Sequence, residues 1–162
     1  MTNLDYIKNK FYDKTTIINQ LNIWRSENKK IVFTNGCFDI LHKGHIEYLS
    51  KSKDFGDILI VGLNSDNSVK RLKGEERPIN HQNSRSFILS ALLFVDAVIY
   101  FDEDTPLNLI EIINPDVLVK GGDYKKEDIV GYDFIIERGG IVKTIDLVKG
   151  YSTTNIIKKS RN

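Results

Sequence analysis

Short apolar runs recur along the chain, and each is followed by a mixed polar and apolar segment long enough for a helix. The runs are rich in Ile and Val and show no polar alternation, which is typical of strands covered on both faces. Glycine or polar residues follow most of them. The sequence therefore predicts five buried strands, at residues 31–33, 58–61, 97–100, 117–119 and 141–142.

Amphipathic segments of helix length separate these runs. Thr105-Pro106 is a typical helix start, and Asn114-Pro115 is a typical stop because the residue before proline avoids helical backbone. Alternating strands and helices favour a single α/β domain with a Rossmann-like, mainly parallel sheet and helices on both faces. Ligands of such sheets bind at the carboxyl ends of the strands. The predicted helices cover residues 15–27, 44–54, 65–72, 84–94, 105–113, 127–138 and 153–159.

Composition narrows the class of protein. The 162 residues are 41% hydrophobic and 28% charged, as in one globular domain. A formal net charge of +1 argues against a broad surface for nucleic acid or membrane. No apolar stretch is long enough to span a bilayer, and no secretory signal pattern is present. Cys37 is the only cysteine, so no intramolecular disulfide can form, and we expect a cytoplasmic protein.

The first predicted strand leads into a loop with two glycines and two histidines. Gly36 permits a tight turn whose N–H groups face an anion, and a helix beginning near Gly44 presents an N-terminus that favours phosphate. His42 and His45 could donate hydrogen bonds to a phosphoryl group as charge builds on it. A structural histidine pair is one alternative; a zinc site with Asp39 is another, but it lacks further nearby ligands. The run is Thr34-Asn35-Gly36-Cys37-Phe38-Asp39-Ile40-Leu41-His42-Lys43-Gly44-His45.

Two later segments suit a nucleotide. Lys120-Gly121-Gly122-Asp123 follows a predicted strand, and its glycines permit close approach of a base or ribose, although Gly-Gly is also common in plain turns. Tyr151-Ser152-Thr153-Thr154 opens the last predicted helix, where N–H groups and hydroxyls suit phosphates, although such residues also serve as ordinary caps.

The loop from Gly36 to His45 resembles the Gly-x-Phe-Asp-x-x-His-x-Gly-His signature of the cytidylyltransferase-like nucleotidyltransferases, and the Ser-Thr-Thr segment resembles that family's second signature. Further motifs, in order, look like the adenylyltransferase domain of heptose 1-phosphate adenylyltransferases. They are Asn64-Ser65-Asp66, Lys73-Gly74, Arg77-Pro78-Ile79-Asn80, Arg85, Phe101-Asp102-Glu103-Asp104-Thr105-Pro106 and the Lys120–Tyr124 segment.

The resemblance covers residues 28–158, so we expect residues 28–162 to form the nucleotidyltransferase domain and residues 1–27 a helical extension. In that family the domain is often fused to a sugar kinase. The remaining residues leave no room for one, so we expect a stand-alone enzyme, with a separate kinase upstream. The resemblance also implies a homodimer.

The implied reaction transfers AMP from ATP to D-glycero-D-manno-heptose 1-phosphate, giving ADP-heptose for lipopolysaccharide or another surface glycan. Mg²⁺ should arrive with ATP and not in an all-protein cage. His42 and His45 should hold the α- and β-phosphates, and Lys73 should neutralise them. We expect Cys37 to pack beneath the loop and not to act as a nucleophile.

The remaining site residues fall into two predicted groups. Guanidinium groups bind phosphate bidentately, so Arg77 and Arg85 are candidates for the acceptor phosphate. Asp39 could orient a histidine or help to hold a hydrated cation, and Asp66 could contact sugar hydroxyls. The substrate group is Asp39, Asn64, Asp66, Arg77 and Arg85; the nucleotide group is Thr34, Asn35, Gly36, Cys37, Phe38, Lys120, Gly121, Gly122, Asp123, Tyr151, Ser152, Thr153 and Thr154.

Two other functions stay open. The chain could act on glycerol phosphate, phosphoethanolamine or flavin mononucleotide, but Lys149-Gly150-Tyr151 stands where glycerol-phosphate cytidylyltransferases carry Arg-x-x-Gly. It could instead be a non-catalytic nucleotide-binding module. Such a module should have lost a histidine or the Ser-Thr-Thr segment, and both are present.

Overall fold

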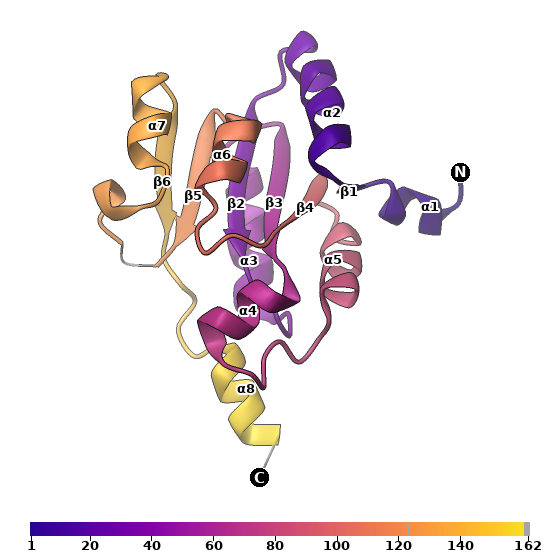
Figure 1. Ribbon diagram of the computed structural model, residues 1–162, viewed down its shortest axis with the longest axis vertical. Helices are drawn as coiled ribbons and strands as arrows, with labels where there is room; N and C mark the ends of the chain where they lie inside the picture. The colour runs from indigo at the N-terminus through magenta and orange to yellow at the C-terminus, as the bar shows by residue number, and fades with distance from the viewer. Residues whose placement is uncertain (123, 161–162) are drawn as a thin grey trace.

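A six-stranded parallel sheet forms the centre of the molecule (Figure 1). The structure is a computed structural model that describes residues 1–122 and 124–160. The strand order is β1-β4-β3-β2-β5-β6, which confirms the predicted parallel α/β fold. The strands are β1 (Phe11–Tyr12), β2 (Ile31–Gly36), β3 (Ile58–Asn64), β4 (Ala97–Phe101), β5 (Val117–Gly121) and β6 (Ile141–Ile145).

Helices cover both faces of the sheet. Helices α2, α6 and α7 pack on one face, and α3 and α5 pack on the other. The helices are α1 (Asn3–Lys8), α2 (Lys14–Ser26), α3 (Lys43–Lys53), α4 (Asp66–Lys73), α5 (Gln82–Ser90), α6 (Leu107–Ile113), α7 (Tyr132–Glu137) and α8 (Thr153–Ser160), with a 3₁₀ turn η1 (Lys126–Asp128).

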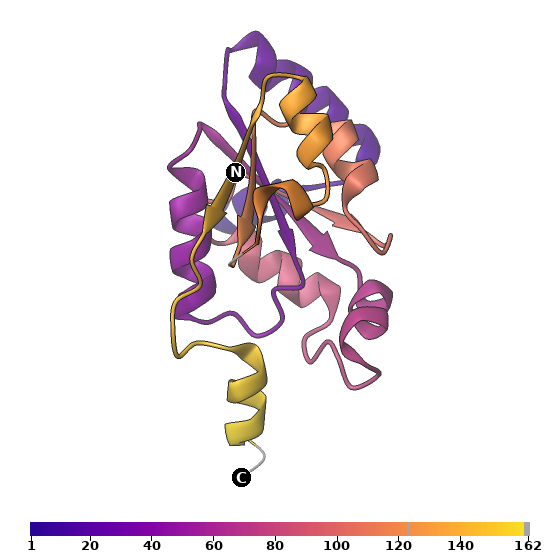
Figure 2. The same cartoon turned by 90° about the vertical axis from the view of Figure 1, so that its left-hand side faces the viewer.

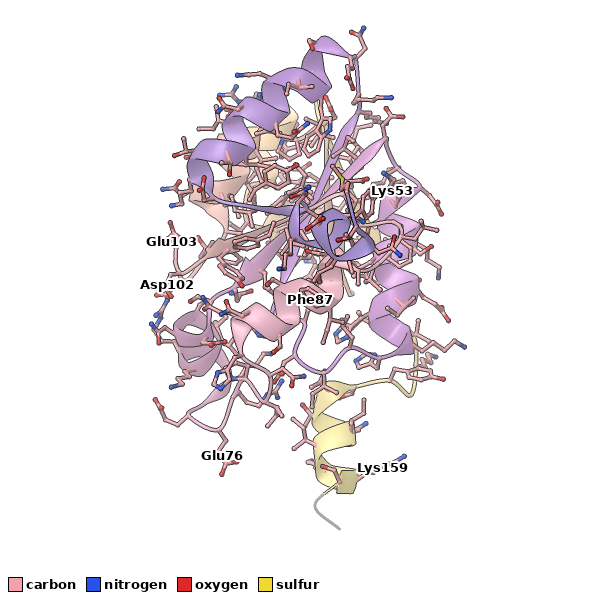
Figure 3. All side chains as sticks on the ribbon, turned by 90° about the vertical axis from the view of Figure 1, so that its right-hand side faces the viewer. Lys53, Glu76, Phe87, Asp102, Glu103 and Lys159 are labelled. Atoms are coloured by element: carbon pink, nitrogen blue, oxygen red, sulfur yellow. The ribbon has the colours of Figure 1, made fainter. Side chains whose placement is uncertain are left out.

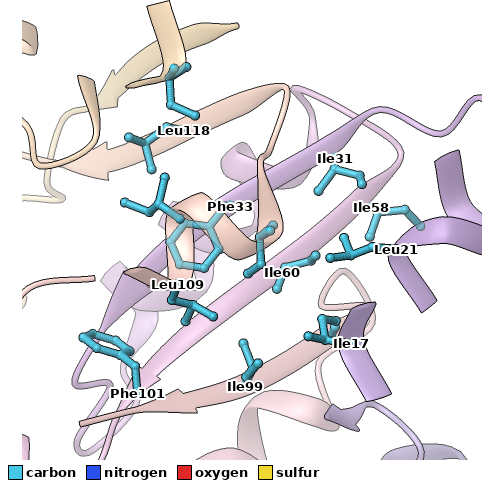
Figure 4. Close-up of a cluster of buried hydrophobic side chains, with 14 of the residues drawn as sticks. Ile17, Leu21, Ile31, Phe33, Ile58, Ile60, Ile99, Phe101, Leu109 and Leu118 are labelled. Carbon is cyan, nitrogen blue, oxygen red and sulfur yellow. The ribbon is translucent and has the colours of Figure 1, made fainter. Parts of the chain in front are cut away.

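Two apolar cores explain the unbroken Ile and Val runs. Successive strand side chains point to opposite faces, so Ile58 and Ile60 join one core while Leu59 and Val61 join the other. Figure 4 shows the first core, in which Phe33 of β2 lies among side chains from neighbouring strands and from α6. Every residue of β3 is buried. A strand covered on both faces cannot alternate with polar residues, which is why its whole length reads as apolar.

Three predicted helices differ from the structure in their bounds. The helix predicted at 84–94 ends at Ser90, and the next residues form a loop that carries Leu93, 90% exposed. The helix predicted at 127–138 is divided into η1 and α7, because Gly131 between them has a φ of +90° and cannot continue a right-handed helix. Helix α6 begins at Leu107, two residues later than predicted.

The first 27 residues contribute more than one helix. Helix α1 and strand β1 precede α2, and β1 pairs with β4 at the edge of the sheet. Lys10, only 7% exposed, donates from Nζ to the carbonyl oxygen of Leu92 over 3.1 Å. This segment therefore adds an edge strand to the sheet and packs α2 against one core, whereas the sequence pattern predicts neither β1 nor α1.

The strand order determines where a ligand can enter. Strand β2 lies inside the sheet, with β3, β4 and β1 on one side and β5 and β6 on the other. Loops from the two halves diverge at its carboxyl end, which is the usual position of a crevice in such sheets. Helix α8 continues beyond that end and projects from the body (Figure 2). Within residues 1–122 and 124–160, no helix combines the length and apolar character needed to cross a membrane.

Candidate active site

The carboxyl ends of β2 to β6 open into one cavity of about 700 Å³. Its wall includes most of the predicted site residues: Asn35, Gly36, Cys37, Phe38, Asp39, His42, His45, Asn64, Lys73, Arg77, Lys120, Gly121, Tyr151, Ser152, Thr153 and Thr154. Segments far apart in the sequence thus converge on one space.

Tight packing in the β2–α3 loop explains its two glycines. A Cβ at Gly36 would lie 2.9 Å from the Phe38 ring, and a Cβ at Gly44 would lie 3.1 Å from the His42 ring. Phe38 and Ile40 have φ values of +43° and +55°, in the left-handed region that few non-glycine residues adopt. The loop therefore folds back on itself, and it brings His42 to the first turn of α3.

His42 and His45 form a stacked pair on the cavity wall. Their ring centroids lie 3.8 Å apart with an interplanar angle of 20°. The Phe38 and His45 rings form an edge-to-face pair whose centroids lie 5.5 Å apart. Both Nδ1 atoms are buried, and neither has a hydrogen-bond partner among the described residues. Burial lowers the pKa of His42. Burial, and then the proximity of His42, lowers the pKa of His45 to about 4. Both rings are therefore neutral near pH 7.

Three cationic side chains lie on the same wall. Lys73 ends α4 and is exposed, whereas Arg77 is held by the Asp39 carboxylate. Lys120 Nζ donates to Asn35 Oδ1 over 3.4 Å, and burial lowers the pKa of Lys120. The cavity thus combines positive charge with neutral imidazoles, which suits a polyphosphate.

Asp39 fixes the segment that carries Arg77. Its carboxylate accepts hydrogen bonds from Arg77 Nε at 2.8 Å, Ile79 N at 2.7 Å and Asn80 N at 2.9 Å. Burial alone would raise the pKa of Asp39, but these hydrogen bonds outweigh it and lower the pKa. The predicted role of Asp39, to orient a histidine or help to hold a hydrated cation, differs from its contacts in the structure, where its carboxylate oxygens bind the Arg77–Asn80 segment.

Arg85 and Asp66 lie behind the wall and not on it. Arg85 is 1% exposed, and its guanidinium donates to Cys37 O at 2.6 Å, Asn80 O at 2.9 Å and Asp66 Oδ1 at 2.8 Å. Asp66 and Gln82 also exchange hydrogen bonds between the starts of α4 and α5. The structure does not bring these two predicted substrate residues into the cavity. They brace the loops that form it.

Other predicted residues also lie off the wall. Thr34 is fully buried, and its hydroxyl lies 2.6 Å from that of Tyr48. Gly122 is buried, and it does not line the cavity. Asp123 lies outside the described residues. Cys37 is half-buried on the wall, and burial raises the pKa of its thiol, so it is a poor nucleophile.

The start of α8 meets the β2–α3 loop. Thr153 Oγ1 donates to Asp39 O over 3.0 Å, and Ser152 Oγ caps the helix by accepting from Asn155 N. The Tyr151 ring lies 6.2 Å from that of His42. The two predicted motifs, more than one hundred residues apart in sequence, therefore form one wall. Ser152 is a cap and a wall residue at once.

Several wall residues are not among the predicted site residues. They are Gly44, Tyr48, Leu72, Phe101, Asp104, Thr105, Pro106, Tyr124, Val130, Leu147 and Val148. The rule that loops after parallel strands line the ligand site could have indicated 104–106 after β4 and 147–148 after β6. Tyr48 lacks such a signal, because it reaches the wall from the second turn of α3.

In the part of the chain that the structure describes, no group of three or more His, Cys, Asp or Glu side chains could hold a metal ion.

The geometry agrees with a known family. The sequence model of the family described as Cytidylyltransferase-like matches residues 33–159, which include both motifs and every strand from β3 to β6. The chain belongs to the cytidylyltransferase-like family. The matched range contains both the histidine loop after β2 and most of α8.

Curated relatives of the family are longer than this chain. The bifunctional protein HldE of Campylobacter concisus is 62% identical over 134 residues, covering 83% of this chain and 28% of that protein. HldE of Campylobacter fetus is 55% identical over 157 residues, covering 97% of this chain and 33% of that protein. The chain thus spans about a third or less of these relatives. The second match includes most of residues 1–27.

A solved structure shares the fold. The lipopolysaccharide core biosynthesis protein from Thermoplasma volcanium GSS1 matches with a TM-score of 0.62 and 33% identity. The match covers 76% of this chain and 99% of that protein.

Proposed function

We propose that this chain transfers AMP from ATP to a heptose 1-phosphate, releasing pyrophosphate and forming ADP-heptose. The observation that carries the proposal is the convergence of the His42–His45 pair, Lys73, Arg77 and the start of α8 on one cavity. The similarity to HldE and to a lipopolysaccharide core biosynthesis protein supports the sugar phosphate as the acceptor.

The reaction needs alignment and charge stabilisation more than covalent help. An oxygen of the sugar phosphate attacks the α-phosphorus of ATP, a new P–O bond forms, and the bond to the β-phosphate oxygen breaks. Neutral His42 and His45 each carry one N–H, which can donate to phosphate oxygens as charge develops. Because the rings stack, one ring limits the movement of the other.

Lys73 and Arg77 would neutralise different phosphates. Lys73 ends α4 on an exposed side chain, so it can follow the triphosphate and the leaving pyrophosphate. Arg77 is fixed by Asp39, and a fixed guanidinium suits the phosphate of the acceptor. The backbone N–H groups and hydroxyls at the start of α8 add donors for the tail of the nucleotide.

Mg²⁺ would enter with ATP. The Asp39 carboxylate at the cavity wall is already engaged by three donors, so the wall suits an ion held by phosphate oxygens and water. Such an ion would neutralise charge on the triphosphate. Homodimer formation and supply of the acceptor by a separate sugar kinase stay predictions from the resemblance.

A pyrophosphate-release panel tests the proposal. Purified protein with Mg²⁺ is given ATP, CTP, GTP or UTP together with heptose 1-phosphate, other sugar 1-phosphates, glycerol phosphate or phosphoethanolamine. ATP with a heptose 1-phosphate should give the highest kcat/KM, and excess EDTA should stop turnover. Tenfold faster turnover with CTP would overturn the adenylyl assignment. Turnover confined to glycerol phosphate would overturn the sugar assignment.

A further inference from the structure

The cavity has two chemically different sides. On the side of β5 and β6 the wall is formed by Gly121, Leu147 and Val148, with the Tyr48 ring beneath Gly121. On the side of β3 and β4 it is formed by Asn64 and by the segment that begins after Phe101. The β2–α3 loop with its histidines lies between the two sides because β2 is the central strand.

We propose that Asp104 and Thr105, together with Asn64, form the surface that recognises hydroxyl groups of the acceptor sugar. This inference rests on the proposed function, and it assigns roles to two wall residues that the sequence analysis did not place in the site. The side at β5 and β6, where Gly121, Leu147 and Val148 lie beside Lys120, is left for the nucleobase.

The polar groups on the β3–β4 side suit a sugar. Asn64 is 4% exposed, and its Nδ2 donates to Ser68 Oγ over 3.0 Å, which orients the amide at the cavity. No hydrogen bond among the described residues engages the Thr105 hydroxyl, which lies exposed on the wall. Asp104 Oδ1 pairs with Arg71 Nε at 3.0 Å, which leaves Oδ2 to accept from a ligand hydroxyl. Amides, hydroxyls and carboxylates are the groups that read hydroxyl patterns.

The distribution of charge on the wall indicates how the acceptor sugar phosphate is oriented when it binds. Asp104 continues an acidic run with Asp102 and Glu103, which lie at the edge of the molecule (Figure 3). Lys14 and Arg71 pair with these three carboxylates and offset part of their charge, so an excess of negative charge remains. A phosphate is therefore attracted away from this run and toward Lys73 and Arg77, which also line the cavity. The sugar ring therefore points its hydroxyls toward Asp104 and Thr105 while its phosphate faces the histidines.

Arg71 holds this surface against α4. Besides Asp104, it contacts the side chain of Asp102 at 3.5 Å and the Asp102 carbonyl oxygen. Helix α4 carries Lys73 two residues later. The hydroxyl-binding segment is thus anchored to the helix that carries Lys73, while the Lys73 side chain itself is exposed.

Thr105→Val and Asp104→Asn test the inference, with Asp102→Asn as the matched control. The control also removes a carboxylate paired with Arg71, but Asp102 is not on the wall. The KM for heptose 1-phosphate should rise about 5–20-fold in each test variant, as expected for one lost hydrogen bond. The Kd for ATP, measured by calorimetry without acceptor, should stay within about twofold of the wild-type value in all three variants, because none of them removes a proposed contact with the nucleotide.

Monodeoxy analogues of the acceptor provide a second readout. At least one analogue should bind the wild type about tenfold less well than the parent sugar does. The same analogue and the parent sugar should bind Thr105→Val equally well, because that variant has already lost the hydrogen bond that the analogue lacks. An active wild type with unchanged acceptor KM in both test variants would overturn this inference alone. Raised Kd values for ATP in the two test variants would indicate that the nucleotide binds on the side of β3 and β4, and would overturn the inference too. A wild type that binds ATP but turns over no sugar 1-phosphate would overturn the proposed function and this inference together.

Discussion

Two stacked imidazoles would repel each other if both were protonated, and burial removes that difficulty by keeping both neutral. A neutral ring still donates one hydrogen bond, so the pair retains what phosphate chemistry requires. His45 is the more deeply affected residue, since its pKa falls to about 4. Packing around the two rings, and not residue type alone, therefore determines their protonation state.

His45→Ala should leave a folded protein whose turnover falls by about 10²–10³, the usual cost of removing one preorganised donor. ATP affinity should change less than turnover, because the contact strengthens in the transition state. His42→Ala should be similarly damaging, and the double variant less than additive. Melting temperature and steady-state rate are measured on the same preparation. Near-normal turnover in folded His45→Ala would refute the mechanism.

The low pKa of His45 also predicts a pH dependence of stability. Between its ordinary pKa of 6.5 and about 4, the unfolded chain binds a proton that the folded protein does not. The free energy of unfolding therefore falls as the pH falls through this window. Urea unfolding between pH 7 and pH 4 should show a shallower fall for His45→Gln than for the wild type. His81→Gln, at a side chain 89% exposed, should not flatten the curve. Parallel curves for wild type and His45→Gln would contradict the prediction.

Whole elements are joined at this site by a few polar contacts. Helix α8 has no buried residue, and Thr153 Oγ1 ties its start to the β2–α3 loop. Helices α4 and α5 are joined through Asp66, Gln82 and Arg85. These contacts determine where each helix presents its N-terminus. Substitutions in α8 and α5 therefore distinguish residues that bind ATP from residues that hold the helices in place.

Thr154→Val should weaken ATP binding by about 1–3 kcal/mol, because it removes a wall hydroxyl that no described residue engages. Thr153→Val should weaken ATP binding and also lower the melting temperature, since its hydroxyl holds the β2–α3 loop. Calorimetric titration and thermal unfolding distinguish the two effects. Unchanged ATP affinity in both variants would show that the start of α8 is only a helix cap and does not bind the nucleotide.

Arg85→Lys should lower the free energy of unfolding by about 2–3 kcal/mol, because a lysine cannot reproduce three buried guanidinium contacts. Arg71→Lys is the matched control: its partners are exposed, so the loss should stay below about 1 kcal/mol. Both values come from urea unfolding at pH 7. Equal losses would show that Arg85 is not the brace.

At the scale of the molecule, the cavity unites residues from Asn35 to Thr154. Its walls come from strands, two helix starts and several loops, so it exists only in the folded chain. A ligand that binds there stabilises the whole domain and not one loop.

ATP with Mg²⁺ at about 100 times its Kd should therefore stabilise the protein by about 2.7 kcal/mol. For a domain of this size that corresponds to a rise in melting temperature of about 5–10 °C. Differential scanning calorimetry over a range of ATP concentrations measures it, and Thr154→Val should need more ATP for the same rise. A melting temperature independent of ATP would contradict a nucleotide site formed by the fold.

The sequence by itself determined the elements that depend on local chemistry. Buried parallel strands must be apolar along their length, so the five main strands and the fold class could be predicted. The β2–α3 loop could also be predicted, because Gly36, Gly44 and two histidines fulfil requirements that lie within ten residues of each other.

Only the tertiary structure decided which polar residues reach the cavity. Arg77 and Arg85 are both arginines of the same segment, yet Arg77 pairs with Asp39 and lines the cavity, whereas Arg85 pairs with Asp66 and is buried behind the wall. Strand β1 is too short to give a pattern, and its pairing with β4 comes from a distant segment. The low pKa of His45 depends on burial, which no spacing of residues reveals. Chain neighbours specify local geometry, whereas desolvation and long-range hydrogen bonds arise only once the helices have packed.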